Sequence, residues 1–169
     1  MTYTPRRAHK NTRKVSKKKE DRVASEIGGH RVPASGAMAH SKDDVRAQGK
    51  VRVEHKYTAK DSYRFDPRDF IGLKKRANSM GEQPVFIVEL SNGRTKIAIT
   101  QDHLPSGISG LVLSNTKTYL FKEENLKELE REAGSRPYLL VVGFVGAHAS
   151  GEQFYVTPYS AYLETLHGN

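Results

Sequence analysis

The chain has 169 residues, of which 36% are hydrophobic and 28% are charged, and it contains no cysteine. This length suffices for one domain with a hydrophobic core or for two small units. No apolar run approaches the roughly 20 residues that cross a bilayer. The lack of cysteine excludes disulfides and thiolate metal sites, so a reducing cytoplasm is the simplest setting. The formal net charge of +9 favours a polyanionic partner, and nucleic acid is favoured over a membrane surface.

Much of the positive charge lies near the N-terminus. Residues 1–22 contain nine Lys or Arg and two acidic residues. Because almost no apolar side chain interrupts this stretch, we predict that residues 1–16 form a disordered basic arm that contacts phosphates. A solubilising tail without a partner is the alternative. The predicted DNA contacts in this region are Arg6, Arg7, Lys10, Arg13, Lys14, Lys17 and Lys18.

Helical and strand patterns follow in alternation, which predicts an α/β fold with a mixed β-sheet flanked by helices. Gly28-Gly29 is a helix stop, and Ser91-Asn92-Gly93 is a hairpin turn. We assign this part, residues 17–104, to one core. The predicted elements are a helix over 17–27, strands over 43–48 and 51–57, a helix over 66–80, and strands over 84–90 and 94–100.

The remaining residues, 105–169, are predicted to form a strand-helix-hairpin unit that resembles a degenerate repeat of the core. Coincidental use of the same order of elements is the alternative. In the alignment, Leu111-Val112-Leu113 takes the place of Val51-Arg52-Val53, so Ser114-Asn115-Thr116 stands where the core has Glu54-His55-Lys56. The unit would then lack the acid and the amine. The other aligned pairs are Thr118–Phe121 with Ser62–Phe65, Pro137–Val141 with Pro84–Val88, and Phe154–Thr157 with Ile97–Thr100.

The strand over 51–57 carries the candidate chemistry. Its alternation places Glu54 and Lys56 on one face, with Asp44 on the neighbouring strand. Two carboxylates and the His55 carbonyl suit a hard divalent cation, Mg²⁺ or Mn²⁺, that activates water for phosphodiester hydrolysis. Lys56 would orient that water or stabilise charge, and Glu20 would complete the site. An exposed ion pair between Glu54 and Lys56 is the structural alternative.

Three motifs carry a family resemblance: Gly28 to Ala37, with its R-x-P-x-S-G pattern, Lys42-Asp43-Asp44-Val45, and Val53-Glu54-His55-Lys56-Tyr57-Thr58. Together they resemble the PD-(D/E)XK nuclease superfamily, and within it the archaeal and phage Holliday-junction resolvases. The resemblance implies a restriction-endonuclease-like core and a homodimer that cuts four-way DNA junctions in a bacterial or archaeal cell, encoded by the cell or by a phage. It implies a site of Asp44, Glu54 and Lys56 with a helix acid, Glu20 or Glu26, and DNA contacts from Arg31 and Ser35.

Further DNA contacts are predicted from the polar residues around these motifs, Lys42, Thr58, Lys60 and Ser62. Four of the seven histidines, His30, His40, His55 and His103, are candidate metal ligands, but they lack the spacing of a zinc motif. A different class of function is a DNA-binding or architectural protein that keeps a nuclease fold without turnover. A repair or restriction-type nuclease of the same superfamily is a further alternative.

Overall fold

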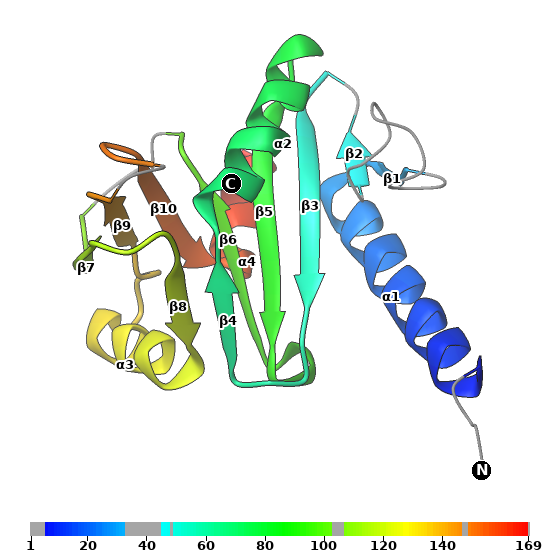
Figure 1. Ribbon diagram of the computed structural model, residues 1–169, viewed down its shortest axis with the longest axis horizontal. Coiled ribbons are helices and arrows are strands. Elements are labelled where there is room, and N and C mark those ends of the chain that lie inside the picture. The colour runs from blue at the N-terminus through cyan, green and yellow to red at the C-terminus, as the bar shows by residue number, and fades with distance from the viewer. Residues whose placement is uncertain (1–5, 33–44, 48, 103–106, 147–148, 169) are drawn as a thin grey trace.

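The computed structural model describes residues 6–32, 45–47, 49–102, 107–146 and 149–168, with side chains from Lys17 onward. One mixed sheet of eight strands crosses the molecule in the order β1-β2-β3-β5-β6-β10-β9-β7, and β4 and β8 form a separate two-stranded ribbon (Figure 1). The predicted α/β class with a mixed sheet is therefore confirmed. The elements are α1 (Arg6–Ile27), β1 (His30–Arg31), β2 (Val45–Ala47), β3 (Val51–Tyr57), β4 (Ser62–Phe65), α2 (Pro67–Ser79), β5 (Gln83–Leu90), η2 (Ser91–Gly93), β6 (Thr95–Thr100), β7 (Gly110–Ser114), β8 (Tyr119–Lys122), α3 (Glu123–Ala133), β9 (Leu140–Phe144), β10 (Gln153–Pro158) and α4 (Tyr159–Leu166).

Two halves of the chain repeat one connectivity within this sheet. In the first half, β3 pairs parallel with β5 and β5 pairs antiparallel with β6. In the second half, β7 pairs parallel with β9 and β9 pairs antiparallel with β10. The halves join through antiparallel pairs, β6 with β10 and β4 with β8. The molecule therefore has the strand order of an internal dimer, with a pseudo-twofold axis between β6 and β10.

The register of the two joining strand pairs agrees with this pseudo-twofold axis at the level of single residues. Ile99 pairs with Val156, and Arg64 pairs with Leu120. Both pairs unite residues that the sequence alignment made equivalent, as expected where a twofold axis crosses two antiparallel strands. The halves share one hydrophobic core that contains Phe65 and Phe121. The boundary predicted near residue 104 thus separates two halves of one sheet.

Two parts of the sequence alignment were wrong. Because Ile99 corresponds to Val156, the β5–β6 and β9–β10 registers make Leu140 the equivalent of Phe86. The alignment through the prolines had placed Leu139 there, a slip of one residue that reverses the faces of a strand. On the same basis, the partners of β9 make Gly110 and Val112 equivalent to Glu54 and Lys56.

The corrected register agrees with the prediction that the second half lacks the acid and the amine, but it changes which residues stand in their place. The second half does lack the acid and the amine, because Gly110 and Val112 stand in their positions. The stretch Ser114-Asn115-Thr116 is not their counterpart. By register, Leu111 and Leu113 are the counterparts of His55 and Tyr57. Residues 114–116 follow Leu113, so they lie beyond the positions that correspond to Glu54 and Lys56.

Helix α1 was predicted to begin near Lys17 after a disordered arm, but it begins at Arg6. Lys and Arg are good helix formers and residues 6–27 contain neither Gly nor Pro, so the basic sequence continues the helix. The helix ends where expected. Gly28 adopts a φ of +72°, and Gly29 lies so close to β2 that an added Cβ would be 2.6 Å from the Arg46 carbonyl oxygen.

The helices cover the two faces of the sheet. Helix α1 buries Val23, Ala24 and Ile27 against one face of β2, β3 and β5, and α4 packs on the same face through Tyr159 and Tyr162. Helix α2 covers the opposite face, with its first turn capped by the Asp66 side chain, which accepts the Arg68 N–H at 3.0 Å. Helix α3 contributes Leu126 to the core on that side. The end of β3 that carries Glu54 and Lys56 is thus placed between α1 and α2.

Candidate functional site

Glu54 and Lys56 lie together on β3, as the strand alternation predicted. Lys56 Nζ is 2.9 Å from Glu54 Oε1, with the Glu54 side chain 18% exposed and that of Lys56 41% exposed. In the parallel register, Lys56 is paired with Val88, whose side chain belongs to the core beneath α2. The carboxylate and the ammonium therefore share one half-buried position at the edge of that core.

Tyr63 and two acidic residues near the start of α2 belong to the same surroundings. Burial raises the pKa of Tyr63 to about 12, an effect opposed by the charge of Lys56 and reinforced by those of Asp69, Glu54 and Asp66. The Tyr63 hydroxyl therefore responds to the charges of both members of the ion pair. The sequence offered only a weak signal for this role, since the Tyr-Arg-Phe pattern of β4 also fits a core strand.

Glu20 on α1 interacts electrostatically with the same strand. Burial raises the pKa of Glu20; His55 and Arg31 oppose the rise, whereas Asp21 and Glu54 reinforce it. Glu26, the alternative helix acid, instead lies near α4. Its carboxylate is 3.7 Å from Arg22, and its backbone carbonyl oxygen is 2.8 Å from His167 Nε2. Of the two candidates, Glu20 is the one whose pKa responds to the charge of Glu54, and that charge is the smallest of the influences on it.

Asp44 lies outside the described residues, as do Ser35 and Lys42. Strand β2 begins at the next residue, Val45, which pairs antiparallel with Val53, the residue before Glu54. Within the described residues β2 therefore covers the outer edge of β3 only as far as Val53. The next residue on β3 is Glu54, a candidate metal ligand.

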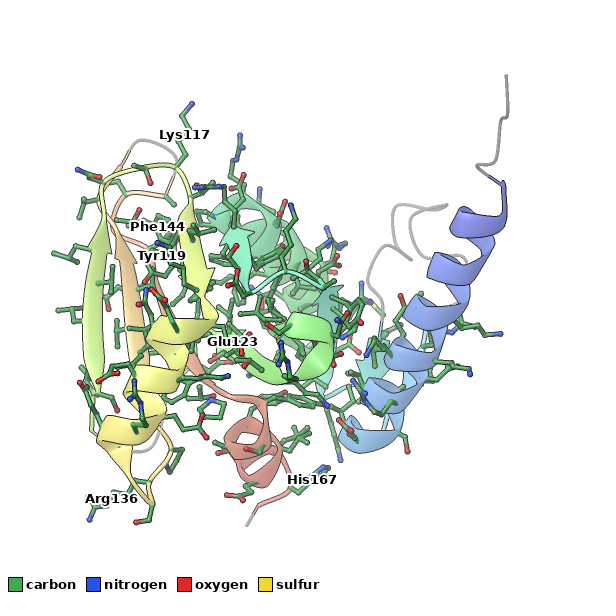
Figure 2. All side chains as sticks on the ribbon, turned by 90° about the horizontal axis from the view of Figure 1, so that it is seen from below. Lys117, Tyr119, Glu123, Arg136, Phe144 and His167 are labelled. Carbon is green, nitrogen blue, oxygen red and sulfur yellow. The ribbon has the colours of Figure 1, made fainter. Side chains whose placement is uncertain are left out.

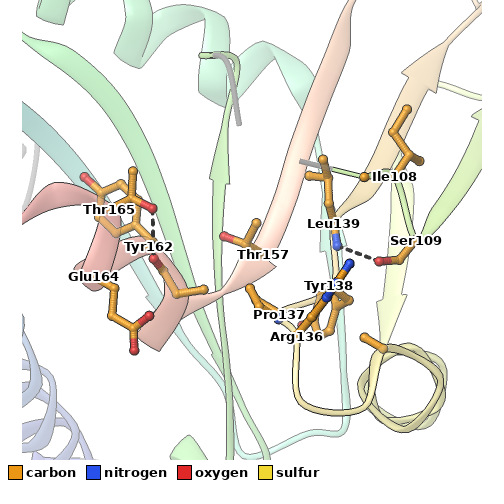
Figure 3. A pocket seen from close by; sticks show the side chains of 13 residues that line it. Ile108, Ser109, Arg136, Pro137, Tyr138, Leu139, Thr157, Tyr162, Glu164 and Thr165 are labelled. Atoms are coloured by element: carbon orange, nitrogen blue, oxygen red, sulfur yellow. Dashed lines mark hydrogen bonds between the residues drawn. The ribbon is translucent and has the colours of Figure 1, made fainter. Parts of the chain in front are cut away.

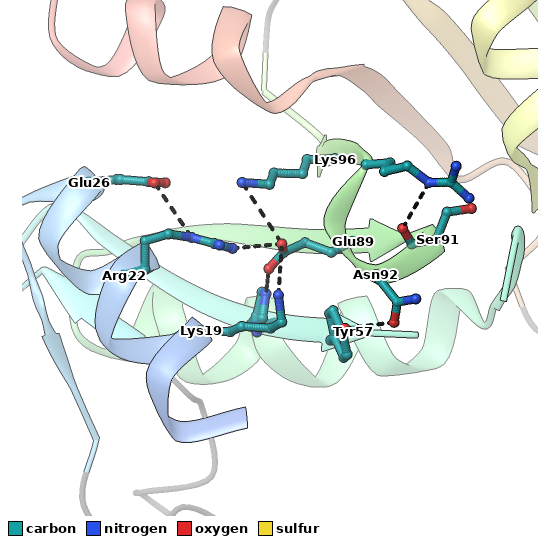
Figure 4. A network of polar contacts seen from close by, with 10 residues as sticks. Lys19, Arg22, Glu26, Tyr57, Glu89, Ser91, Asn92 and Lys96 are labelled. Atoms are coloured by element: carbon teal, nitrogen blue, oxygen red, sulfur yellow. Dashed lines mark hydrogen bonds and ion pairs between the residues drawn. The ribbon is translucent and has the colours of Figure 1, made fainter. Parts of the chain in front are cut away.

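A buried carboxylate that the sequence analysis missed connects α1 to β3 and β5. Glu89 is fully buried, and its two oxygens lie 2.6 Å from Arg22 Nη2 and 2.5 Å from His55 Nε2 (Figure 4). Lys19 Nζ and Lys96 Nζ are each 3.9 Å from Glu89 Oε1. Burial alone would raise the pKa of Glu89, but the hydrogen bonds and charges of His55 and Arg22 lower it to about 2. The only sequence signal was one acid inside the apolar run of β5.

This network fixes both elements of the site. Lys19 and Arg22 flank Glu20 on α1, and Lys19 also lies over the Tyr57 ring, 4.1 Å from its centroid. The side chain of His55 is directed to Glu89, so His55 is not a metal ligand through its imidazole in this arrangement. His30 is exposed on β1, and His40 and His103 lie outside the described residues.

The predicted DNA contacts are distributed over several elements. Arg31 pairs with Asp21 at 3.1 Å. Lys17, Lys18 and Lys60 are exposed. The other polar residues lie at the start of β4 or before it: Thr58 Oγ1 accepts the Lys60 N–H at 3.1 Å, and Ser62 opens the strand. The remaining five cations, Arg6, Arg7, Lys10, Arg13 and Lys14, belong to the N-terminal half of α1.

A pocket of about 740 Å³ lies in the other half of the molecule, between α4 and the start of β9 (Figure 3). Its lining includes Ser109, Tyr138, Leu139, Thr157 and Tyr162, and contains none of the predicted site residues. Ser109 Oγ accepts the Leu139 N–H at 3.0 Å, which explains the inward position of that hydroxyl. We therefore place the candidate chemistry at β3.

Among the residues that the structure describes, a metal-binding cluster and a membrane-spanning helix are both absent. No group of three or more His, Cys, Asp or Glu side chains is placed to hold a metal ion. No described helix has the length and apolar character needed to cross a membrane. Comparisons with known proteins add no family: no protein-family model matches this chain, and no curated protein matches it significantly in sequence.

Proposed function

We propose that the protein is a metal-dependent endonuclease that hydrolyses phosphodiester bonds in branched DNA, with four-way junctions as its preferred substrate. The observation that carries the proposal is the Glu54–Lys56 ion pair on β3, whose carboxylate also influences the pKa of Glu20 on α1 through its charge. An acid and an amine two residues apart on a strand, with a helix acid that responds to the charge of the strand acid, are consistent with the constellation that the sequence motifs predict. The assignment of family and substrate depends on those motifs.

The fold of the first half supports a restriction-endonuclease-like core. Strands β2, β3, β5 and β6 are adjacent in the sheet, with α1 on one face and α2 on the other. Asp44 immediately precedes β2, whose register runs toward Glu54. We propose that Asp44 supplies the second carboxylate.

Carboxylate oxygens are the ligands that a divalent cation such as Mg²⁺ or Mn²⁺ prefers, and the proposed site depends on Asp44 in addition to the described acids. Glu20 and Glu54 each disfavour the charge of the other, and the burial of Glu20 adds to this effect, so a bound cation would stabilise both as anions. Asp44 and the His55 carbonyl would complete the ligand set. When bound, the metal supplies a water of lowered pKa and polarises the phosphate.

The side chains of the protein would do the remaining work. Lys56, held beside Glu54 and 41% exposed, stabilises the negative charge that develops on the phosphate oxygens. The Glu89 network holds α1, and with it Glu20, against β3. Basic residues of α1 bind the phosphodiester backbone outside the cleavage site.

The test is cleavage of a four-way junction, a flap, a linear duplex and a single strand, each with and without Mg²⁺ or Mn²⁺. We expect symmetric paired nicks in the junction alone, and their loss in Asp44→Asn and Glu54→Gln. Glu124→Gln, at an exposed position on α3, is the matched control and should cut normally. Equal cutting of the linear duplex would indicate a repair or restriction-type nuclease instead.

A non-catalytic DNA-binding protein is the second candidate, favoured by the basic helix α1 and its nine Lys or Arg residues. It predicts binding that weakens with salt and no metal-dependent product. Cleavage by the wild-type protein that disappears in Glu54→Gln would exclude it.

A further inference from the structure

Strand β7 forms one end of the sheet and carries an apolar patch. Five large hydrophobic side chains are at least half exposed among the described residues, and four lie at this strand: Ile108 is 64% exposed, Leu111 60%, Leu113 62% and Val145 56%. Val145 joins the patch because its N–H donates to the Ser114 carbonyl oxygen at 2.9 Å. In the part of the chain that the structure describes, no strand pairs with the outer edge of β7.

In the first half of the molecule, the strand that corresponds to β7 is β3, and a further strand pairs with its outer edge. There, β2 pairs antiparallel with β3 and places Val45 and Ala47 on the face that α1 covers. In the second half, Leu111 lies on that same face of the sheet, since its partner Val141 corresponds to Ile87. The position beside β7 is therefore suited to an antiparallel strand with apolar residues on this face.

We propose that this strand is β7 of a second copy of the chain, so that two molecules join edge to edge in a twofold dimer. With Val112 opposite Val112 of the second copy, Leu111 faces Leu113 of the second copy and Gly110 faces Ser114. Opposite residues of an antiparallel pair share a face, so the leucines of both strands meet. Strand β7 has no charged residue that would oppose such pairing, unlike most protected edges.

The charges around β7 complement this arrangement. The groove beside Gly110 and Leu111 is lined by Glu128 and Glu132 of α3 and by Lys122 of β8, so its ionisable lining carries a net negative charge. Lys117 follows the opposite end of the strand and lies far from Arg136 (Figure 2). The antiparallel orientation brings Lys117 of one copy toward the acidic groove of the other.

The distribution of net charge favours the same contact. Each copy carries a formal charge of +9, and α1 with its basic residues lies at the end of the sheet opposite β7 (Figure 1). Joining at β7 keeps the two basic helices apart, which limits their repulsion. The interface uses only residues of the second half, so it is independent of the proposed nuclease activity.

The first experiment is disulfide trapping on the axis. Because the chain has no cysteine, Val112→Cys introduces a single thiol that meets its copy across the twofold axis. We expect an oxidised species of twice 18.9 kDa that reduction reverses. Met80→Cys, at a residue that is 50% exposed on the first half, is the control and should cross-link much more slowly. Equal trapping of both variants would overturn the proposal.

The second experiment measures mass by sedimentation without cross-linking. The wild type should form a dimer with increasing concentration, and Leu111→Lys/Leu113→Lys should remain monomeric because like charges then lie opposite each other. Met80→Lys should behave as the wild type, and circular dichroism should show that all three are folded. A monomeric wild type up to its solubility limit, larger open assemblies, or a double-lysine variant that still dimerises would each contradict this interface.

Discussion

His55 and Glu89 form a buried hydrogen-bonded pair, with His55 Nε2 2.5 Å from Glu89 Oε2 and both side chains 3% exposed or less. His55 stands between Glu54 and Lys56 on β3, and Glu89 also accepts a hydrogen bond from Arg22 of α1. The same carboxylate is therefore linked to the strand that carries the candidate acid and amine and to the helix that carries Glu20. We infer that Glu89 is a positioning residue, because it links the strand and the helix of the proposed site and touches no proposed reacting atom.

Glu89→Gln should destabilise the protein by about 3–5 kcal/mol, because it removes the buried carboxylate shared by several cationic side chains. Denaturation in urea, followed by circular dichroism, measures this difference. Glu124→Gln is the exposed control, with an expected change within about 0.5 kcal/mol. Equal stability of both variants would show that the network does not hold α1 on the sheet.

The pH dependence of the free energy of unfolding should reflect the ionisation of Glu89. The pKa of Glu89 is lowered from 4.5 to about 2 in the folded protein. Its contribution is present above the unfolded value and is lost as the pH falls through the folded one. The wild type should therefore lose stability between pH 4.5 and pH 2, and Glu89→Gln should show a shallower slope there. A slope unchanged by the substitution would contradict the assignment.

Substitution of Glu20 and substitution of Glu26 should have different effects on the cleavage rate. Glu20→Gln is expected to reduce junction cleavage by about 10- to 100-fold, the range found for residues that support a metal site, whereas Glu26→Gln should have little effect on the rate. Because the pKa of Glu20 is raised while no metal is bound, metal affinity and the cleavage rate should both fall as the pH drops toward 4.5. Steady-state cleavage across pH tests both points. A larger loss in Glu26→Gln would reverse the assignment.

The local patterns of the sequence predicted much of the first half. The alternation in residues 51–57 gave the bounds of β3, and Asp66-Pro67 gave the start of α2 because the capping carboxylate and the fixed φ of proline act locally. Helix α1 is longer than the sequence patterns predict, because the charged residues 6–16, whose composition is typical of disorder, also favour a helix. Helix α4 was not predicted.

Long-range relations were beyond the sequence patterns. Glu89 receives its partners from α1, β3 and β6, which meet only in the folded chain. The repeat was visible at β4 and β8, where aromatic residues match, but β7 shares no such signal with β3. Its correct equivalents, Gly110 and Val112, follow only from pairing with β9.

DNA binding should depend on the exposed cations of α1. Lys17→Ala/Lys18→Ala should weaken binding to every DNA form alike and reduce the slope of log K against log salt by about two, since each phosphate that is no longer neutralised lowers the slope by roughly 0.9. Fluorescence anisotropy at several salt concentrations measures that slope. Lys75→Ala, at an exposed position on α2, is the control and should leave it unchanged. A uniform slope in all variants would place the nucleic-acid surface elsewhere.

Lys56→Met should separate catalysis from binding most clearly. The substitution keeps the length of the side chain and removes the ammonium that lies 2.9 Å from Glu54. We expect cleavage to fall by about 100-fold or more, because one charge that stabilises the transition state is removed. Junction binding should change little, since it rests on many phosphate contacts. Single-turnover cleavage with saturating protein measures the chemical step apart from binding. Full activity in Lys56→Met would show that the Glu54–Lys56 pair is only structural.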